Sequence, residues 1–414
     1  MRMIFLAPLL ALTPSVALAE PLTFDAAIAR ATGDAPSIQA GEAGVEAKRS
    51  ASIAAGRLPD PTLNVGIENF PISGPPAFSF TRDSMTMARI GIEQAFPNPA
   101  KRRAQRLRAQ ADIGIAQGNL SLEAQNVKLE TALAWINLYY AKRRLAQLDR
   151  LTASLNDLQS TVSARLASGS ARPSQVLEPA QLRAAVNDRR SELAAEAVRA
   201  KARLVRFTGD PQADVAGTPP IVAVDRLSLI AGLSSLPRLQ VLDAGIRGAE
   251  ADSGLARADK RPDWRVSTSY GRRDPAYGDM ISVGVSVDLP LFAGRRQNPK
   301  IAARASEETQ ARLIRTAVER ELRAELDGEL ADHAMHMQRL DNARKVLVPL
   351  AKRRAELDMV SYSAGRLDLG SALLSSLALA EAEVDALSRE ADVARDTVKI
   401  NYTYGPISNR ELRP

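Results

Sequence analysis

The sequence predicts a mainly α-helical fold with a small β part, in which the order helix, strand hairpin, very long helix, helix occurs twice. Three observations lead to this prediction. Short segments alternate apolar and polar residues, two very long runs read as helix, and the two halves of the chain resemble each other. The composition agrees, because only 4% of the 414 residues are aromatic and the chain is rich in Ala, Leu, Arg and Glu, as long, closely packed helices are.

The alternating segments form two predicted hairpins, with strands at about 62–70 and 86–94 and at about 264–271 and 280–289. A period of two places the apolar residues of a strand on one face and the polar residues on the other. The apolar face of a soluble sheet covers a core. In an outer-membrane barrel that face meets lipid, while the polar face lines a wet lumen.

On the membrane interpretation, each strand contributes side chains to both environments. The predicted lumen residues are Asn64, Glu68, Arg89, Glu93, Arg265, Ser286 and Asp288. The predicted lipid-facing residues are Leu63, Val65, Ile67, Ile90, Ile92, Val266, Val283, Val285 and Val287. Four strands are too few to close a barrel, for which about eight are needed, so closure requires several chains.

The start of the chain predicts export. Arg2 is basic, Met3–Leu12 is apolar, and Ala17–Ala19 has the small residues of a cleavage site, so residues 1–19 read as a signal peptide. The chain has no cysteine. Disulfides and a lipid anchor on an amino-terminal cysteine are therefore excluded.

The duplication divides the chain. Leu58–Asp60 before the first strand matches Arg261–Asp263 before the third, and Ser168-Gly169 falls opposite Ala364-Gly365. We therefore expect a first repeat over 20–210, a linker over 211–225, a second repeat over 226–404 and a tail over 405–414.

The helical runs are longer than those of ordinary globular domains. Residues Ala100–Ser168 contain no proline and would span about 100 Å as one helix. The second run, Lys300–Ser363, is interrupted in sequence by Gly328 and Pro349. Heptad-like spacing predicts antiparallel helical hairpins that pack on partner helices, and the alternative is an ordinary helical bundle. The spacing is carried by Leu148, Leu151, Leu155, Leu158 and Val162, and by Leu373, Leu377, Ala380, Val384, Leu387, Ala391, Ala394 and Val398.

With these features in order, the chain resembles the TolC-like family of outer-membrane efflux channels. The resemblance rests on the opening Leu22–Ala27, the duplicated hairpins, Val287–Phe292 leading into a long helix, and the Tyr362–Arg366 turn. It implies a homotrimer with a twelve-stranded outer-membrane β-barrel, a helical periplasmic tunnel, and an equatorial belt from Thr208–Asp225 and the tail. It also implies docking to a periplasmic adaptor and an inner-membrane RND-type pump, with no cofactor and no chemistry of its own.

The helical turns are the predicted periplasmic tips, where the adaptor docks or the channel is gated. The residues concerned are Gly169, Gly365, Arg366 and Asp368. Some relatives carry aspartates at the positions that Ser371 and Leu374 occupy here. Asp368 either takes over as an acidic gate or merely caps the returning helix.

Other function classes are disfavoured by what the sequence contains. The net charge is +7, but Arg and Glu alternate along helical faces, as in Glu319–Glu325, which indicates solvated helices rather than nucleic-acid binding. There is no cysteine nucleophile, Gly-x-Ser-x-Gly elbow or phosphate-binding glycine loop. The sequence therefore predicts that the protein is not an enzyme.

The substrate is predicted from a closer resemblance. Glu68–Pro71, Asp83–Met87 and Glu93–Arg102 resemble the heavy-metal branch of the family, whose pumps expel copper, silver, cobalt, zinc or cadmium ions. His333 and His336 share a helical face beside methionines and are weak candidates for a metal site, with interface histidines as the alternative. Efflux of drugs or other organic compounds stays open, as do a soluble periplasmic coiled-coil scaffold and a periplasmic adaptor.

Overall fold

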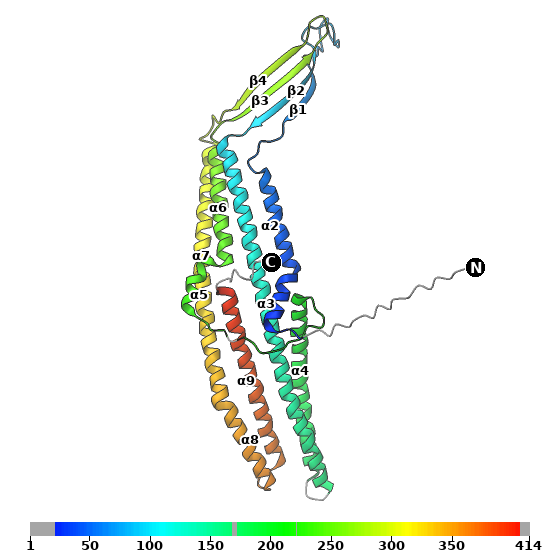
Figure 1. Cartoon of the computed structure of the whole chain (residues 1–414), viewed down its shortest axis with the longest axis vertical. Helices are drawn as coiled ribbons and strands as arrows, with labels where there is room; N and C mark the ends of the chain where they lie inside the picture. The colour runs from blue at the N-terminus through cyan, green and yellow to red at the C-terminus, as the bar shows by residue number, and fades with distance from the viewer. Residues whose placement is uncertain (1–20, 168–171, 221, 406–414) are drawn as a thin grey trace, which may run out of the picture. The chain divides into compact units, whose positions relative to one another are not determined.

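The computed structural model describes residues 21–167, 172–220 and 222–405 (Figure 1). The predicted signal peptide, the turn around Gly169 and residues 406–414 of the tail lie outside this range. The first half of the chain contains α1 (Phe24–Asp34), α2 (Pro36–Ala54), β1 (Thr62–Glu68), β2 (Met87–Phe96), α3 (Pro99–Ala167), the 3₁₀ helix η1 (Pro173–Val176) and α4 (Leu177–Thr208). The second half contains α5 (Arg226–Gly232), the 3₁₀ helix η2 (Leu233–Ser235), α6 (Pro237–Ala258), β3 (Asp263–Arg272), β4 (Met280–Asp288), α7 (Gln297–Asn342), the π-helical segment η3 (Ala343–Leu347), α8 (Val348–Ser363) and α9 (Leu369–Tyr404).

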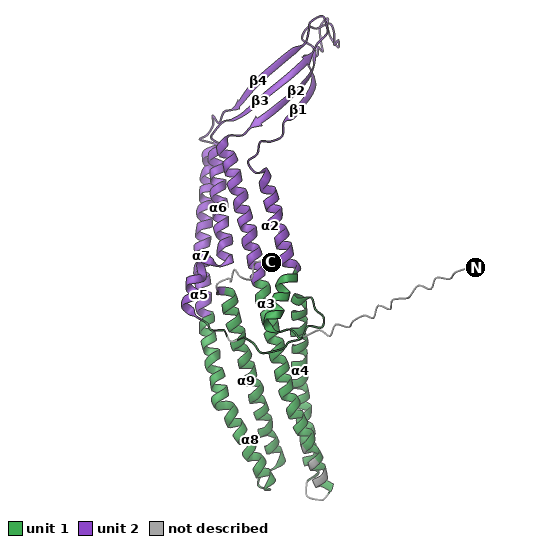
Figure 2. Cartoon of the chain, viewed as in Figure 1, with its two compact units in different colours: residues 1–35, 126–224, 329–403 green, residues 36–125, 225–328, 404–414 purple. Residues whose placement is uncertain are grey.

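The chain forms two compact units, and each takes segments from both halves of the sequence (Figure 2). Unit 1 comprises residues 1–35, 126–224 and 329–403, and unit 2 comprises residues 36–125, 225–328 and 404–414. Helices α3 and α7 contribute residues to both units. Among the described helices, none combines the length and the apolar character needed to cross a membrane.

The sheet of unit 2 has four antiparallel strands in the order β1-β2-β3-β4. Both predicted hairpins are confirmed as β1 with β2 and β3 with β4, and the central pairing of β2 with β3 joins the two halves of the chain. The mainly helical fold with a small β part is likewise confirmed. Strands β1 and β4 are the two edges of the sheet.

The helices of unit 2 lie in the same order as the strands. Helix α2 packs on α3, where a Cβ at Gly41 would lie 2.9 Å from Leu120 Cδ1. Helix α3 packs on α6, where a Cβ at Gly118 would lie 2.6 Å from Val241 Cγ2, so glycine permits the close approach. Helix α6 packs on α7, where Arg315 Nε lies 3.0 Å from Asp243 Oδ1. The layer α2-α3-α6-α7 therefore has α2 and α7 at its two edges (Figure 1).

The helices of unit 1 pack through the predicted heptad residues. Leu148, Leu155 and Val162 of α3 are buried in one cluster with residues of α4 and α9, including Leu193 and Leu373. A partner helix thus covers the apolar stripe, as a heptad pattern demands. The side chain of Leu158 lies outside the described residues.

A second core cluster of unit 1 surrounds Trp135, which is fully buried. Its ring meets Phe24 edge to face at 5.5 Å between centroids and stacks on Tyr139 at 5.3 Å. The indole Nε1–H donates to the carbonyl of Leu22 at 2.8 Å. This bond satisfies the one polar group of the side chain, as burial of tryptophan requires.

The second long helical run was expected to be interrupted at both Gly328 and Pro349. Among the described residues of this run, the α-helix is interrupted only before Pro349, so the expectation for Gly328 was wrong. Helix α7 continues through Gly328, because a glycine costs only about 1 kcal/mol in a helix and packing can override that cost. The break is the π-helical segment Ala343–Leu347, directly before Pro349. Proline lacks an N–H group and its ring clashes with the carbonyl four residues earlier, so the local hydrogen-bond pattern widens there.

Candidate functional site

All the predicted lumen residues lie on one face of the sheet. The register pairs Arg89 with Gly66 and Gly271, Glu93 with Thr62 and Ser267, and Arg265 with Ala95 and Ser286. Because directly paired residues point to the same side, this register places Asn64, Glu68, Arg89, Glu93, Arg265, Ser286 and Asp288 together. Their role as a lumen surface stays a prediction.

Ion pairs and small residues shape this polar face. Arg89 pairs with Glu68, and Arg265 Nη2 lies 2.9 Å from Asp288 Oδ2. A Cβ at Gly91 would lie only 2.8 Å from Ser269 Cβ, much closer than the ~4.5–5.5 Å usual for paired residues. Only glycine therefore fits at position 91. The polar face thus carries ion pairs and, between them, small residues that pack closely.

The opposite face of the sheet is apolar and uncovered. Val65, Ile281 and Val283 are 74%, 77% and 73% exposed, although such residues are normally buried. The paired residues Phe96 and Trp264 lie at one end of this apolar face. Strand β3 has 10 residues, which span roughly 34 Å. Tilted by roughly 40°, the strand gives a band of about 26 Å, close to the apolar band of outer-membrane barrels.

A polar junction ties the sheet to the helices of unit 2, and sequence reasoning missed it. Asn98 is buried and begins α3 as its N-cap, because its Oδ1 accepts from the Lys101 amide at 2.9 Å. Its Nδ2 donates to Asp263 Oδ1 at 2.9 Å and to the Ala258 carbonyl at 3.1 Å. The Pro-Asn-Pro sequence around Asn98, with a capping residue before a proline at the first helical position, was the available signal.

Lysines complete the junction. Lys101 Nζ lies 3.0 Å from Asp263 Oδ2 and 3.2 Å from Asp259 Oδ1, and Lys300 Nζ lies 2.6 Å from Asp259 Oδ2. Burial acts to raise the pKa of Asp259, but hydrogen bonds from Lys300 and Lys101 outweigh it and hold that pKa below its ordinary value. Burial acts to lower the pKa of Lys101, and its two aspartate partners raise it overall.

The turn between α8 and α9 is built on Gly365. Its φ is +69°, in the left-handed region that favours glycine. The Arg366 amide donates to the Ser361 carbonyl at 2.8 Å, and the Gly365 amide donates to the Tyr362 carbonyl at 3.0 Å. These two bonds form a Schellman motif that ends α8. The corresponding Gly169 lies outside the described residues.

Asp368 caps the returning helix α9. Its Oδ1 accepts from the Ser371 amide at 2.9 Å, and its Oδ2 accepts from the Ser371 hydroxyl at 2.6 Å. These bonds lower the pKa of the exposed Asp368 carboxyl, so it stays ionised. Asp368 is therefore the N-cap of α9. Contact of this residue and the exposed Arg366 with an adaptor, or a gating role, stays a prediction.

The predicted histidine pair on α7 lies close to one carboxylate of α9, that of Asp396. His336 Nδ1 lies 2.7 Å from Asp396 Oδ2, and His333 Nδ1 lies 4.0 Å from the same atom. Burial lowers the pKa of His333, which favours its neutral form. Within the described part of the chain, no group of three or more His, Asp or Glu side chains is arranged to hold a metal ion. The contacts therefore favour interface histidines over a metal site.

A further charged cluster of unit 1 was not predicted. Glu390 accepts from the Tyr140 hydroxyl at 3.1 Å and pairs with Arg344 at 2.7 Å and with Arg143 at 3.3 Å. Burial and the neighbouring Glu390 carboxylate raise the pKa of Tyr140, so the phenol remains a hydrogen-bond donor. Arg344 belongs to the π-helical segment before Pro349, which is the only sequence signal for this cluster.

No protein-family model and no characterised protein sequence matches the chain, but solved structures do. A membrane protein from Pseudomonas aeruginosa has a TM-score of 0.80 and 15% identity over 92% of this chain and 93% of its own. The outer membrane protein VceC from Vibrio cholerae has a TM-score of 0.77 and 16% identity, covering 92% and 96%. The MtrE outer membrane channel of Neisseria gonorrhoeae, in its open state, has a TM-score of 0.77 and 15% identity, covering 92% and 88%.

Proposed function

We propose that this chain, which has the fold of TolC-like outer-membrane channels, is one subunit of the exit channel of a tripartite efflux system. The observation that carries the proposal is the sheet, with an exposed apolar face on one side and ion-paired, small polar residues on the other. Three copies would supply twelve strands, enough for a closed barrel with a wet interior. The subunits then lie in the outer membrane and extend into the periplasm.

The channel conducts passively. An adaptor in the periplasm and an RND-type pump in the inner membrane deliver the substrate, and the pump supplies the energy. The charged tip residues Arg366 and Asp368 are the proposed adaptor contacts, because they are exposed at a turn whose backbone is fixed by Gly365. No catalytic step and no cofactor are part of this function.

Membrane fractionation separates the channel from a soluble periplasmic scaffold. The full-length protein should appear in the outer-membrane fraction, need detergent for extraction, and run as a trimer on unheated gels that becomes a monomer on boiling. Release of the protein with the soluble periplasmic contents would overturn the proposal.

We further propose heavy-metal cations as the substrate. Besides the resemblance of the strand-flanking segments to that branch, two thioethers support this choice. Met87 shares the polar face with Glu68 and Arg89, and its sulfur lies over Gly271, where a Cβ would approach it to 2.5 Å. Met280 pairs with Gly271 on the same face. Thioethers suit soft ions such as copper(I) and silver(I).

Organic compounds are the second candidate substrate, because a wide, wet channel passes small solutes without binding them. Growth of a deletion strain on graded copper, silver, zinc, cobalt and cadmium, beside dyes and antibiotics, decides between them. The metal proposal expects the deletion strain to be sensitive to these metals, and the plasmid-borne gene should restore its resistance. Sensitivity confined to organic compounds would refute the metal substrate and leave the channel intact.

A further inference from the structure

The connection between β4 and α7, residues 289–296, joins exposed apolar side chains directly to two arginines. We propose that this connection binds the phosphate headgroups of anionic phospholipids, in the leaflet on the helical side of the sheet. The inference rests on the proposed function in one respect, because it takes insertion of the sheet into a bilayer as given. It adds a lipid class and the residues that select it.

The apolar part of the connection comprises Leu289, Leu291 and Phe292. These side chains are 63%, 77% and 71% exposed, although leucine and phenylalanine are normally buried. Leu289 follows Val287 by two residues, and Val287 pairs with Trp264 at the end of the apolar face. Exposed apolar side chains beside a tryptophan are typical of the boundary between the hydrocarbon and the headgroups of a membrane.

Backbone hydrogen bonds hold two arginines next to these apolar side chains. The Arg295 and Arg296 amides both donate to the Phe292 carbonyl at 3.1 Å. The Asn298 amide donates to the Ala293 carbonyl at 2.8 Å. The connection is therefore a fixed turn. Arginine in such a turn is suited to a phosphate group, because its planar guanidinium donates paired hydrogen bonds to phosphate oxygens.

The two arginines of this turn are both exposed, and the nearby aspartates pair with other side chains. Asp288 pairs with Arg265, and Asp259 pairs with Lys300. Within the described chain, neither arginine of the turn makes an ion pair with a carboxylate. Their charges therefore remain available to an anionic partner.

A second turn adds positive charge at the same end of the sheet. Lys260 and Arg261 lie between α6 and β3 and are also exposed. Asp263 at the start of β3 pairs with Asp288 at the end of β4, so the two turns lie at one level. Each lysine or arginine beside an anionic membrane surface strengthens binding by about fivefold. The two turns together thus favour anionic over zwitterionic phospholipids.

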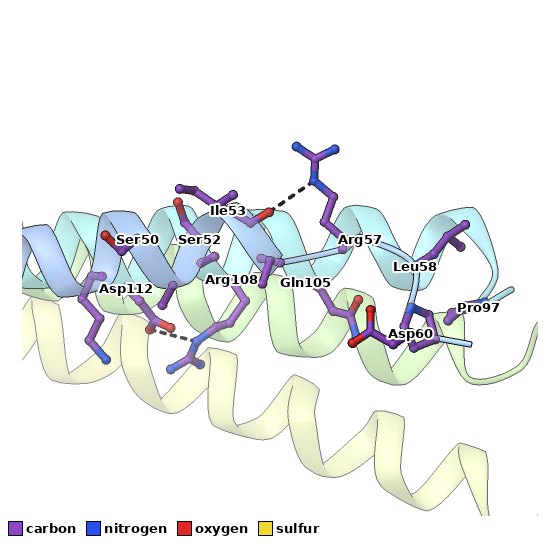
Figure 3. A pocket seen from close by; sticks show the side chains of 17 residues that line it. Ser50, Ser52, Ile53, Arg57, Leu58, Asp60, Pro97, Gln105, Arg108 and Asp112 are labelled. Carbon is purple, nitrogen blue, oxygen red and sulfur yellow. Dashed lines mark hydrogen bonds and ion pairs between the residues drawn. The ribbon is translucent and has the colours of Figure 1, made fainter. Parts of the chain in front are cut away.

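The connection at the other edge of the sheet, between α2 and β1, lacks this pattern (Figure 3). Arg57 Nε donates to the Ile53 carbonyl at 3.2 Å, and Asp60 three residues later offsets the charge of this arginine. That connection offers a phospholipid no net positive charge. The lipid site is therefore expected on the β4 side of each copy.

Trp264 can report on lipids at this end of the sheet, because brominated acyl chains quench indole fluorescence on contact. The full-length protein is reconstituted into vesicles of phosphatidylcholine and phosphatidylglycerol, with bromine on one lipid or the other. The ratio of the two quenching constants gives the preference for the anionic lipid. Trp135 is fully buried and should not respond. We expect phosphatidylglycerol to be preferred about fivefold.

Variants of the turn locate the preference. Arg295→Gln with Arg296→Gln should reduce it to less than about twofold, the remainder coming from the second turn. Arg295→Lys with Arg296→Lys keeps the charge and should keep most of the preference. The matched control, Arg353→Gln with Arg354→Gln, removes two neighbouring exposed arginines of α8 and should leave the preference unchanged.

Three outcomes would overturn the lipid site while keeping the channel. The first is equal quenching by both lipids in the unsubstituted chain. The second is an unchanged preference in the glutamine variant. The third is a preference that added salt does not weaken, since salt screens exposed charges, and this measurement needs no variant. A protein that does not insert into the vesicles would instead refute the proposed function and the lipid site together.

Discussion

The sheet of unit 2 and the Trp135 cluster of unit 1 use the same kinds of apolar side chain in opposite settings. In the cluster, Ile136 and Leu138 are completely enclosed by other helices. In the sheet, Val283 and Ile281 have no covering layer within the described chain. The difference teaches that the chain completes one apolar surface by itself and leaves the other for its surroundings. On the proposed function, those surroundings are lipid.

The two tryptophans of the sequence test this comparison with the largest expected effect. Trp135→Ala removes a fully buried ring and its hydrogen bond to Leu22, so we expect a loss of about 3–5 kcal/mol. Trp264→Ala removes a ring that is 49% exposed on the apolar face, and its cost should be less than half of that. The measurement is the unfolding midpoint of the helical circular dichroism signal in detergent. Equal losses would erase the distinction between the two regions.

A charge on either face of the sheet is the next test. Val285→Arg places a charge on the apolar face, at a cost of about 2–4 kcal/mol in the middle of a bilayer, and should reduce the heat-modifiable trimer. Ser286→Arg places the same charge at the next position of β4, which points to the polar face of the sheet, and should leave the trimer intact. Identical behaviour on gels would mean that the faces are assigned wrongly.

The junction that holds the sheet on the helices should matter less. Asn98→Ala removes the cap of α3 and the bonds to Asp263 and Ala258, for an expected loss of about 2 kcal/mol. The unfolding midpoint in urea provides the measurement. Asn98→Ser, which keeps a capping oxygen without adding a charge beside Asp263, should lose less than the alanine variant, and a reversed order would contradict the capping role.

The same junction predicts a pH dependence. Because the folded-state pKa of Asp259 lies below its ordinary 3.8, its stabilisation is present above pH 3.8 and is lost as the pH falls through the folded-state pKa. The raised pKa of Lys101 means that its contribution is present below pH 10.5 and is lost as the pH rises through its folded-state value. Asp259→Asn should therefore lower stability at pH 7 and flatten the acid limb of the stability profile.

The helical turn should show the smallest effect on stability. Asp368→Lys removes the cap of α9 and reverses the charge, whereas Asp368→Asn keeps a capping oxygen. We expect about 1 kcal/mol of destabilisation for the lysine variant only. If the tip contacts an adaptor through charge, the asparagine variant should also lose efflux while its trimer forms normally. Full efflux with Asp368→Asn would restrict Asp368 to capping.

Regular patterns were the features that the sequence could predict. Strand alternation identified both hairpins and the side that Arg89 and Glu93 share, and heptad spacing identified the buried Leu148 and Leu373. The Pro-Asn-Pro sequence could have indicated the helix cap at Asn98. The bonds from Asn98 to Asp263 and Ala258 could not be predicted, because these residues are far apart in sequence and meet only after the two halves pair. The continuity of α7 through Gly328 was also missed, since packing by neighbouring helices outweighs a local preference.

The open edge strands β1 and β4 affect how readily a subunit aggregates before it assembles. On the proposed function, a newly exported copy carries two sheet edges with unpaired backbone groups beside an uncovered apolar face, and such edges accept any extended strand. Closure of the proposed ring would then compete with aggregation from the moment of folding. On the proposed function, binding to other copies is part of the stability of the folded subunit, which therefore depends on its concentration. Overproduction in the aqueous compartment should yield aggregates, whereas delivery at the membrane surface should yield closed rings.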